Sequence, residues 1–500
     1  MTEQYVIAFD EGTTSARAVI FDRSGSVVTI AQEEFPQIYP RPGWVEHDPD
    51  VIWQTQLKVA RQAIAEAGLQ AANIAAIGIT NQRESTVIWE RSTGRPIYNS
   101  ICWQDRRTAG HCDALRARGL ERYVVDTTGL VVDAYFSATK IAWILDHVPG
   151  ARARAEQGEL LFGTIDSWLI WNLTGGKVHA TDVTNASRTL LFNIHTVDWD
   201  ERLLRELDVP RAILPSVHDT SHVFGMTAPD LFGGEIPVGS AVGDQQGALF
   251  GHACFERGMA KCTYGTSASL VMNTGDAPVA PGSGMLSTIA VSLDGKVQYA
   301  IEGVLFICGA AIQWLRDELR LIEKSSDAIV TTEDTNGVYF VPAFTGMSAP
   351  LWDAYARGTI VGLTRGANRE HLIRAALESM AYQVHDVVVA MENLSETEVS
   401  SIRVDGGSCT NDFVMQFQAD MSNLPILRPV VTEAAARGAA FLAGLAVGYW
   451  KDRAELSDKF ELERTFERQM DPARVEKLYA GWTRAVQRSL AWVDPEEANA

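Results

Sequence analysis

Two segments of this chain place an aspartate beside a hydroxyl-rich turn, a combination that suits phosphate chemistry. The first is residues 5–21, in which an apolar run ends at Asp10, a polar turn begins with Gly12, and a second apolar run follows. A carboxylate at a strand end beside a donor-rich turn can hold a phosphate and its metal ion. An ordinary hairpin with a polar tip is the alternative. The turn supplies hydroxyls and backbone N–H groups from Thr13, Thr14 and Ser15.

The second segment repeats this pattern more than 200 residues later in the printed sequence. Residues 236–243 are small or apolar and lead into Asp244. Residues 260–272 then read as a strand, a turn of Gly265, Thr266 and Ser267, and another strand. Two such units, far apart in the chain, indicate a duplicated fold whose halves face each other across a cleft.

Three further positions carry weaker signals. Arg83 and Glu84 are adjacent, so they can serve one ligand only where a strand ends or bulges; a solvated turn with a weak surface ion pair is the alternative. Tyr135 by itself is typical of packing. Gly406 and Gly407 follow a predicted strand and permit close backbone approach to the base and ribose of a nucleotide.

The elements that must position these residues are those of an α/β protein. Three short strand signals over residues 5–31 predict a meander, which indicates a mixed sheet rather than an all-parallel one. We expect a strand over residues 74–80 and a helix that Asp50 caps. Asn368 is the predicted cap of a later helix. An apolar stripe predicts another helix, through Ile312, Leu315, Leu319 and Ile322.

Composition narrows the possible partners. A chain of 500 residues predicts two or more domains, and a net charge of −20 argues against nucleic acid and anionic membrane. Its six cysteines form no CxxC pair, which favours a reduced, cytoplasmic chain over a disulfide scaffold or zinc site. The N-terminal residues 1–4 do not read as a signal peptide, and no apolar run is long enough to span a bilayer.

Neither a P-loop nor the protein-kinase signature set occurs in the sequence. Phosphoryl transfer would therefore use the two hairpins, and it needs positioning, Mg²⁺ and charge neutralisation more than covalent chemistry. Asp10 and Asp244 are the predicted metal-associated carboxylates. Asp244 is also the predicted catalytic base, which would take the proton of an acceptor hydroxyl. The predicted phosphate cradle is Thr13, Thr14, Ser15 and Arg17 from one hairpin and Gly265 and Thr266 from the other.

Longer runs identify a family. Residues 10–15, 243–246, 265–267 and 405–407 resemble the FGGY family of sugar and polyol kinases, in the actin-like ATPase superfamily. Residues 39–48, 78–84 and 184–189 resemble its glycerol-phosphorylating members, and the likeness covers nearly the whole chain. The resemblance implies two ribonuclease-H-like domains, each a mixed β-sheet flanked by helices, with a cleft between them. Residues 1–245 would carry the first phosphate motif and most polyol contacts, and residues 246–500 would bind the nucleotide.

The resemblance also implies the reaction and its contacts. It predicts ATP-dependent, Mg²⁺-assisted phosphorylation of glycerol to sn-glycerol 3-phosphate by a homo-oligomer, a dimer or tetramer. The expected glycerol contacts are Arg83, Glu84, Trp103, Tyr135, Asp244 and Gln245. The expected nucleotide contacts are Thr266, Gly309, Gln313, Gly407 and Asn411.

The sequence departs from the family pattern at two places. After Gly265 and Thr266, relatives that phosphorylate glycerol usually carry Gly, a small residue and Phe. This chain has Ser269 at the position of that Phe. A kinase for a longer polyol or a sugar is therefore the near alternative. Residues 228–235 lack the arginine or histidine through which some relatives are controlled. The distant alternative is an actin-like ATPase that is not a kinase, which needs no acceptor pocket at Arg83, Glu84 and Tyr135.

Overall fold

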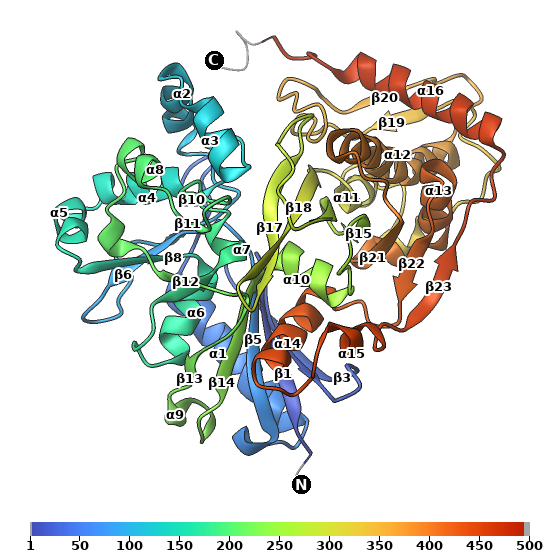
Figure 1. Cartoon of the computed structure of the whole chain (residues 1–500). Helices are drawn as coiled ribbons and strands as arrows, with labels where there is room; N and C mark the ends of the chain where they lie inside the picture. Colours follow the sequence, from blue (N-terminus) through green and yellow to red (C-terminus); the bar gives the residue numbers. More distant parts are fainter. Residues whose placement is uncertain (1–2, 495–500) are drawn as a thin grey trace.

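The computed structural model describes residues 3–494, so Met1 and Thr2 of the signal-peptide expectation lie outside the described residues. Two mixed sheets organise the chain, one of six strands from the first half and one of seven from the second. In Figure 1 the blue and green first half lies mostly to one side and the yellow to red second half to the other. The predicted α/β class with two sheet-based halves is confirmed.

The first sheet has the order β13-β14-β5-β1-β2-β3. Its strands β1, β2 and β3 form the predicted antiparallel meander, whereas β5 and β14 run parallel to β1. In register, Asn81 pairs with both Glu11 and Gly243, so β1, β5 and β14 end together at one edge of the sheet. The strands are β1 (Tyr5–Glu11), β2 (Ser15–Phe21), β3 (Val27–Glu34), β5 (Ile74–Asn81), β13 (Ser221–Met226) and β14 (Pro237–Gly243).

The second sheet, of order β17-β18-β16-β15-β21-β22-β23, repeats the first one's core pattern. Strands β15 and β16 form an antiparallel hairpin like β1 and β2, and β21 runs parallel to β15 as β5 does to β1. The duplication predicted from the two turn motifs is therefore confirmed. The strands are β15 (Met259–Tyr264), β16 (Ala268–Gly275), β17 (Leu286–Leu293), β18 (Lys296–Leu305), β21 (Ser401–Asp405), β22 (Ile426–Pro429) and β23 (Leu462–Phe466).

Helices cover both sheets. In the first sheet, alternate residues of β1 face opposite ways: Ile7 packs in the core with α1 and α6, and Ala8 packs in the core with α14. In the second sheet, β15 and β16 share a core with α11, α12 and α13. The helices are α1 (Pro49–Glu66), α2 (Ala109–Ala117), α3 (Glu121–Thr128), α4 (Ser137–His147), α6 (Ile165–Leu173), α10 (Asp244–Gly251), α11 (Gly309–Asp317), α12 (Arg369–Ser395), α13 (Asp412–Ser422), α14 (Ala434–Ala446) and α16 (Pro472–Ser489).

Helix α14 lies late in the sequence but packs on the first sheet and on α10 (Figure 1). The two helices approach so closely that a Cβ on Gly438 would lie 1.9 Å from the carbonyl oxygen of Gly247. A Cβ on Gly78 of β5 would likewise lie 2.2 Å from the oxygen of Ala439. The Ala- and Gly-rich composition of α14 is thus required by contact with α10, the helix that begins at Asp244.

Two helix predictions need correction, and one is confirmed. Asp48, not Asp50, caps α1, because Pro49 takes the first helical position and Asp48 Oδ1 accepts from the N–H of Asp50 at 2.9 Å. Helix α11 ends at Asp317, before Leu319, because the chain leaves the helical conformation near Arg320, whose φ is +53°. Asn368 caps α12 as predicted.

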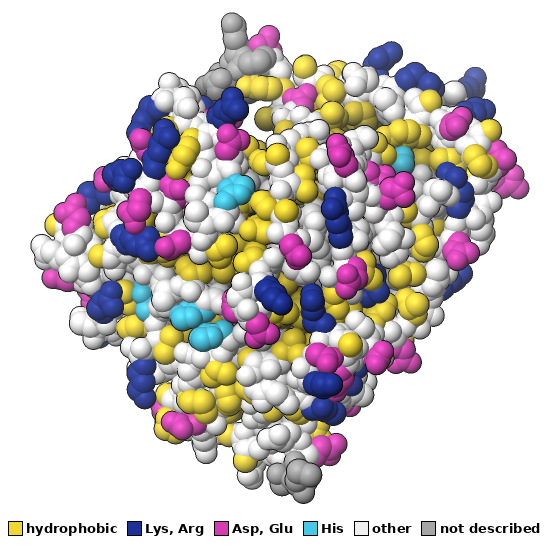
Figure 2. Space-filling view, viewed as in Figure 1, with side chains coloured by type: hydrophobic (Ala, Val, Ile, Leu, Met, Phe, Trp, Pro, Cys, Tyr) yellow, Lys and Arg dark blue, Asp and Glu magenta, His cyan; other side chains and the backbone are white. Residues whose placement is uncertain are grey.

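The surface and the cysteines agree with the composition. On the face shown in Figure 2, Lys and Arg side chains are scattered among Asp and Glu and gather into no broad basic patch. All six cysteines are buried and unpaired. Within residues 3–494, no helix is both long enough and apolar enough to cross a membrane.

Candidate active site

The common edge of β1, β5 and β14 brings the predicted chemical groups together. Asp10 lies near the end of β1, Arg83 follows the end of β5, and Asp244 follows the end of β14. Ligand sites of α/β sheets form at the carboxyl ends of parallel strands, because loops leave the sheet there. Arg83 Nε lies 3.1 Å from Asp244 Oδ1, so β5 and β14 deliver a direct contact.

The side chains of Arg83 and Glu84 lie in one charge cluster because the chain bends between β5 and the next strand. Glu84 has a φ of +61°, a left-handed conformation that is costly for a residue with a side chain. The side chains of Arg83 and Glu84 are only 4% and 1% exposed. The alternative of a solvated surface turn is therefore wrong, and the predicted strand end with a bend is confirmed.

A buried cluster of alternating charges surrounds this bend. Arg83 binds Glu302 through both terminal nitrogens, at 3.0 and 2.6 Å. Arg188 Nε lies 2.6 Å from Glu84, and Arg188 Nη1 lies 3.0 Å from Glu302. Two guanidinium groups thus share two buried carboxylates, and Arg83 also reaches the more exposed Asp244. In such an arrangement each charge depends on its partners.

The cluster includes two residues that the sequence analysis did not assign, Glu302 and Arg188. Glu302 lies on β18 among buried apolar residues. A lone acidic residue in such a strand is a usable signal, because a buried carboxylate needs a partner. Arg188 falls within a run that supported the family resemblance, but local sequence gives no reason to aim it at Glu84.

Burial and neighbouring charges set the protonation of the cluster. Burial alone would raise the pKa of Glu302, but the guanidinium groups of Arg83 and Arg188 lower it to about 2. Burial raises the pKa of Asp10 to about 6; Arg17 opposes the rise, and Glu433 and Asp244 add to it. The effect of Asp244 on Asp10 indicates that the two predicted metal-associated carboxylates are near enough to interact.

The depressed pKa of Glu302 predicts how acid affects stability. Because its folded-state pKa lies below the unfolded value of 4.5, its ion pairs contribute stability above that value and lose it as the pH falls toward 2. We expect the difference in free energy of unfolding between the wild type and Glu302→Gln to shrink by about 1.4 kcal/mol per pH unit below about pH 4.5. Urea unfolding of both proteins from about pH 7 to about pH 3 measures this difference. A difference in free energy of unfolding that stays constant over this range would contradict the lowered pKa of Glu302.

Two aromatic side chains lie beside the charge cluster. The rings of Trp103 and Tyr135 meet edge to face with centroids 5.5 Å apart. The guanidinium of Arg188 lies 5.8 Å from the centre of the Tyr135 ring. Gln245, next to Asp244 on α10, accepts a hydrogen bond from Lys261 Nζ. The aromatic pair therefore lies beside the charge cluster through Arg188, whereas the side chain of Gln245 is held by Lys261 and adjoins the cluster only through Asp244.

The turn after β1 presents backbone donors. Within the described part of the chain, residues 3–494, the N–H groups of Thr13 and Thr14 donate to no other group of the protein. Ser15 Oγ accepts from Gln32 at 3.0 Å. Arg17 is bound to Asp10 at 3.4 Å and to Glu433 at 2.6 Å, so carboxylates already engage part of its guanidinium. Two adjacent free N–H groups suit an anion such as a phosphate oxygen.

A cavity of about 990 Å³ opens between α11, α12, α13 and the turn after β15. Gly309 begins α11 so close to this turn that a Cβ on it would lie 2.6 Å from the carbonyl oxygen of Gly265. A Cβ on Gly407, by contrast, would meet no other atom within 4 Å. Apolar walls of Ile312 and Met380 face backbone and amide groups, as a base and ribose require. All six predicted residues from the second half line it: Gly265, Thr266, Gly309, Gln313, Gly407 and Asn411.

Asn411 has a structural task as well. Its Oδ1 accepts from the N–H groups of Phe413 and Val414 and so caps α13, and its Nδ2 donates to the oxygen of Ala328. The side chain therefore shapes the cavity wall, with its polar atoms already engaged by the protein.

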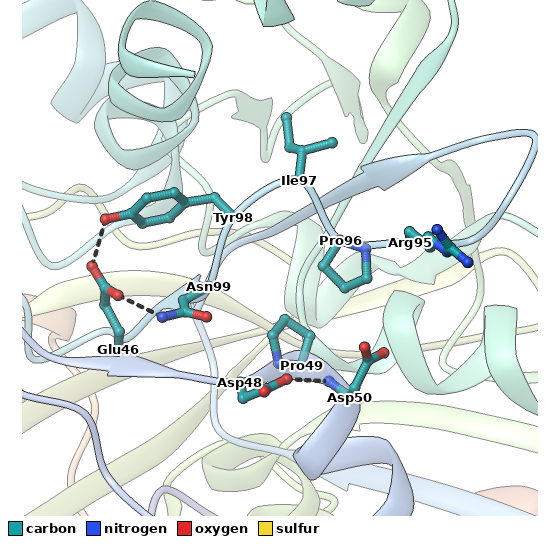
Figure 3. A pocket seen from close by; sticks show the side chains of 9 residues that line it. All are labelled: Glu46, Asp48, Pro49, Asp50, Arg95, Pro96, Ile97, Tyr98 and Asn99. Carbon is teal, nitrogen blue, oxygen red and sulfur yellow. Dashed lines mark hydrogen bonds between the residues drawn. The ribbon is translucent and has the colours of Figure 1, made fainter. Parts of the chain in front are cut away.

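A second cavity of about 480 Å³ contains none of the predicted site residues (Figure 3). Glu46 accepts from Tyr98 at 2.9 Å and from Asn99 at 2.8 Å, and it also binds Arg107. Asp48 faces the same cavity while capping α1. Because Glu46 and Asp48 are already satisfied by the protein, we assign no substrate to this cavity.

Comparisons with known proteins agree with this geometry. Residues 5–251 match the N-terminal domain of the FGGY family of carbohydrate kinases, and residues 260–447 match its C-terminal domain. Glycerol kinase 2 of Thermotoga maritima is 57% identical over 98% of this chain and 99% of its own. A glycerol kinase of Clostridium botulinum is 57% identical over 99% of this chain and 100% of its own.

Solved structures agree as well. The crystal structure of Plasmodium falciparum glycerol kinase with ADP superposes with a TM-score of 0.91 at 34% identity, covering 98% of both chains. A gluconate kinase from Lactobacillus acidophilus shares the fold with a TM-score of 0.87 at 24% identity, covering 98% of this chain and 99% of its own. Both halves of the sequence and the whole fold therefore lead to one assignment: the chain belongs to the FGGY family of carbohydrate kinases.

Proposed function

We propose that this protein transfers the γ-phosphoryl group of ATP to glycerol and forms sn-glycerol 3-phosphate. The observation that carries the proposal is the contact between Arg83 and Asp244 at a sheet edge that also presents the free N–H groups of the Thr13 turn. This edge offers a base and a phosphate-binding turn, next to groups that recognise hydroxyls. Relatives named glycerol kinase, at 57% identity over nearly the whole chain, support glycerol as the acceptor.

The charge cluster defines what remains for an acceptor. Arg83 has five N–H groups; Nη1 donates to Gln246 and Glu302, and Nη2 donates once to Glu302. One N–H of Nη2 is left, together with Nε, which faces Asp244. Glu84 binds Arg188 through Oε1, which leaves Oε2 as an acceptor. One donor and two carboxylates can thus bind neighbouring hydroxyls of a short polyol, and the Trp103 ring can cover its C–H face.

In the proposed reaction, a primary hydroxyl of glycerol attacks the γ-phosphorus. The new oxygen–phosphorus bond forms as the bond to the β–γ bridging oxygen breaks and ADP leaves. Asp244 accepts the hydroxyl proton, late in a loose transition state. The donors of Thr13, Thr14 and Thr266 hold phosphate oxygens. Asp10 would hold the hydrated Mg²⁺, which neutralises charge on the transferring group.

The two halves would divide this work. We propose that residues 1–245 hold the acceptor and the first phosphate turn, and that residues 246–500 hold the nucleotide. The lining of the larger cavity by second-half residues supports the division. The contact of α14 with the first sheet joins the halves on the side of α10.

A panel of acceptors tests the proposal. ADP release is measured with Mg·ATP and with glycerol, erythritol, xylitol, gluconate or no acceptor. We expect release that depends on glycerol, with kcat/KM highest for glycerol. Equal release without any acceptor would instead indicate an actin-like ATPase, and a preference for a longer acceptor would indicate another kinase of the family.

Ser269 provides a prediction about acceptor size. It is 8% exposed on β16, and its Oγ donates to Glu302 at 3.1 Å. We expect Ser269→Phe to lower the ratio of kcat/KM for erythritol to that for glycerol by about tenfold, because one extra carbon in a filled pocket costs about that much. An unchanged ratio would show that Ser269 does not line the acceptor site. Ser269→Ala, which removes the hydroxyl without adding bulk, is the matched control.

A further inference from the structure

The aromatic side of the acceptor site and the phosphate turn are joined by hydrogen bonds that the reaction itself does not require. Trp103 Nε1 donates to Thr13 Oγ1 at 2.9 Å. The backbone N–H of Trp103 donates to Ser85 Oγ at 3.2 Å, and Ser85 Oγ donates to Gln82 Oε1 at 2.8 Å. Gln82 Nε2 then donates to the carbonyl oxygen of Gly12 at 3.0 Å. Two paths thus lead from Trp103 to adjacent residues of the turn.

The Gln82 path has a geometric consequence. In a trans peptide, the carbonyl of one residue and the N–H of the next point in opposite directions. Gln82 holds the Gly12 carbonyl, so the N–H of Thr13 points away from Gln82. Gln37 Nε2 holds the Thr13 carbonyl at 3.0 Å in the same way and aims the N–H of Thr14. These are the two N–H groups of the turn that have no partner in residues 3–494.

The Trp103 path affects the hydroxyl of the same turn. A threonine hydroxyl has one hydrogen to donate and can also accept. Because the indole N–H of Trp103 occupies an acceptor position of Thr13 Oγ1, the hydroxyl hydrogen is left for another acceptor, such as a phosphate oxygen. The orientation of the indole therefore influences the orientation of the hydroxyl, and an acceptor packed on the ring would restrict both.

Burial supports a fixed arrangement. Ser85 is fully buried and Gln82 is 2% exposed, so water cannot replace their bonds without opening the site. The Gln82 amide oxygen accepts from Ser85 and, in a longer contact of 4.0 Å, from the Cys102 thiol, while its nitrogen donates to Gly12. Loss of the Ser85 hydroxyl would free the amide to rotate and with it the Gly12 peptide.

We propose that Trp103, Ser85 and Gln82 couple the acceptor site to the phosphate turn, so that glycerol and nucleotide each raise the other's affinity. The inference rests on the proposed function. Ser85 and Gln82 are positioning residues, because they act through Trp103 and the turn. By thermodynamic linkage, the factor by which glycerol tightens nucleotide binding must equal the factor by which nucleotide tightens glycerol binding.

Calorimetry with Mg·AMP-PNP, a non-hydrolysable ATP analogue, tests the coupling without turnover. The coupling factor is the ratio of its Kd without glycerol to its Kd with saturating glycerol. We expect a factor of about ten in the wild type, since one well-placed hydrogen bond contributes about that much. Trp103→Phe keeps the aromatic ring and removes the indole N–H; Ser85→Ala breaks the other path. Each should reduce the factor to about two or less.

Matched controls separate coupling from general damage. Trp199→Phe removes a buried indole that bonds the Pro215 oxygen, and Ser395→Ala removes a buried hydroxyl that bonds the Met391 oxygen, both outside the cleft. Both should keep the wild-type factor. Thr13→Val removes the hydroxyl from a half-buried position, so it gives a test even if the buried variants fold poorly.

A double-mutant cycle completes the test. If Trp103 acts through Thr13, Thr13→Val should reduce the coupling factor in the wild type and change it little in Trp103→Phe. Additive effects, or a wild-type factor in Trp103→Phe and Ser85→Ala, would overturn the inference. If the wild type still releases ADP with glycerol in that case, the proposed function stands; if it releases none, the proposed function fails separately.

Discussion

Asp244→Asn should lower kcat for glycerol by about a thousandfold, because an amide cannot take the hydroxyl proton. Glycerol affinity should stay within about threefold, since Glu302 holds Arg83 by two bonds that do not involve Asp244. Single-turnover kinetics give the rate of the chemical step. Calorimetry with glycerol in the presence of Mg·AMP-PNP gives the affinity.

Asp230→Asn is the matched control, because Asp230 is exposed on the short helix α9 (Pro229–Phe232), which precedes β14. It should keep wild-type turnover. If Asp244→Asn turned over glycerol within about tenfold of the wild-type rate, Asp244 would not be the base. A large loss of glycerol affinity with an unchanged rate constant would instead assign Asp244 to binding.

Glu302→Gln should destabilise the protein by about 3 kcal/mol or more, which is typical when one partner of a buried ion pair is removed. The variant leaves Arg83 and Arg188 with a single buried carboxylate, Glu84, in place of two, beside the more exposed Asp244. The kcat/KM for glycerol should fall as well, because the amide has one acceptor oxygen and Arg83 loses one of the two bonds that orient it. Urea unfolding and steady-state kinetics at neutral pH measure the two effects.

A surface ion pair provides the comparison. Glu455 binds Arg23, whose side chain is 57% exposed. Because exposed pairs contribute little, Glu455→Gln should change the free energy of unfolding by no more than about 0.5 kcal/mol. Equal effects of Glu302→Gln and Glu455→Gln would show that the buried cluster does not hold the acceptor site together.

The sequence could predict what depends on local pattern. The hairpins around Asp10 and Thr266 follow from apolar runs interrupted by hydroxyl-rich turns, and their repetition indicates the duplicated sheets. The strand end before Arg83 follows from the need of adjacent residues to face one ligand. These features depend on neighbouring residues, so they can be recognised in the sequence without knowledge of the tertiary structure.

The parts that sequence could not predict depend on contacts between distant residues. Glu302 meets Arg83 across 219 positions of the chain, and no pattern near either residue specifies that pairing. The early end of α11 likewise reflects a turn near Arg320 that the apolar stripe through Ile322 does not reveal. The sequence pattern points to Asp50 in place of Asp48 as the cap, because the proline that follows Asp48 takes the first helical position.

The buried charge cluster distinguishes this chain from an actin-like ATPase that is not a kinase. An ATPase needs access for water at the γ-phosphate, whereas this chain places two buried arginines and two buried carboxylates beside Asp244. Burying four charges is costly even when they are paired, and hydroxyl recognition gives a reason for the chain to keep them. The aromatic pair of Trp103 and Tyr135 adds an apolar surface that a short polyol can cover.

A crystal structure with glycerol and Mg·AMP-PNP tests the central claim most directly. The account predicts a primary hydroxyl of glycerol within about 3 Å of the Asp244 carboxylate and in line with the γ-phosphorus. It also predicts phosphate oxygens at the N–H groups of Thr13 and Thr14. Glycerol bound away from Asp244, or a nucleotide whose γ-phosphate points out of the space between the two turns, would contradict the account.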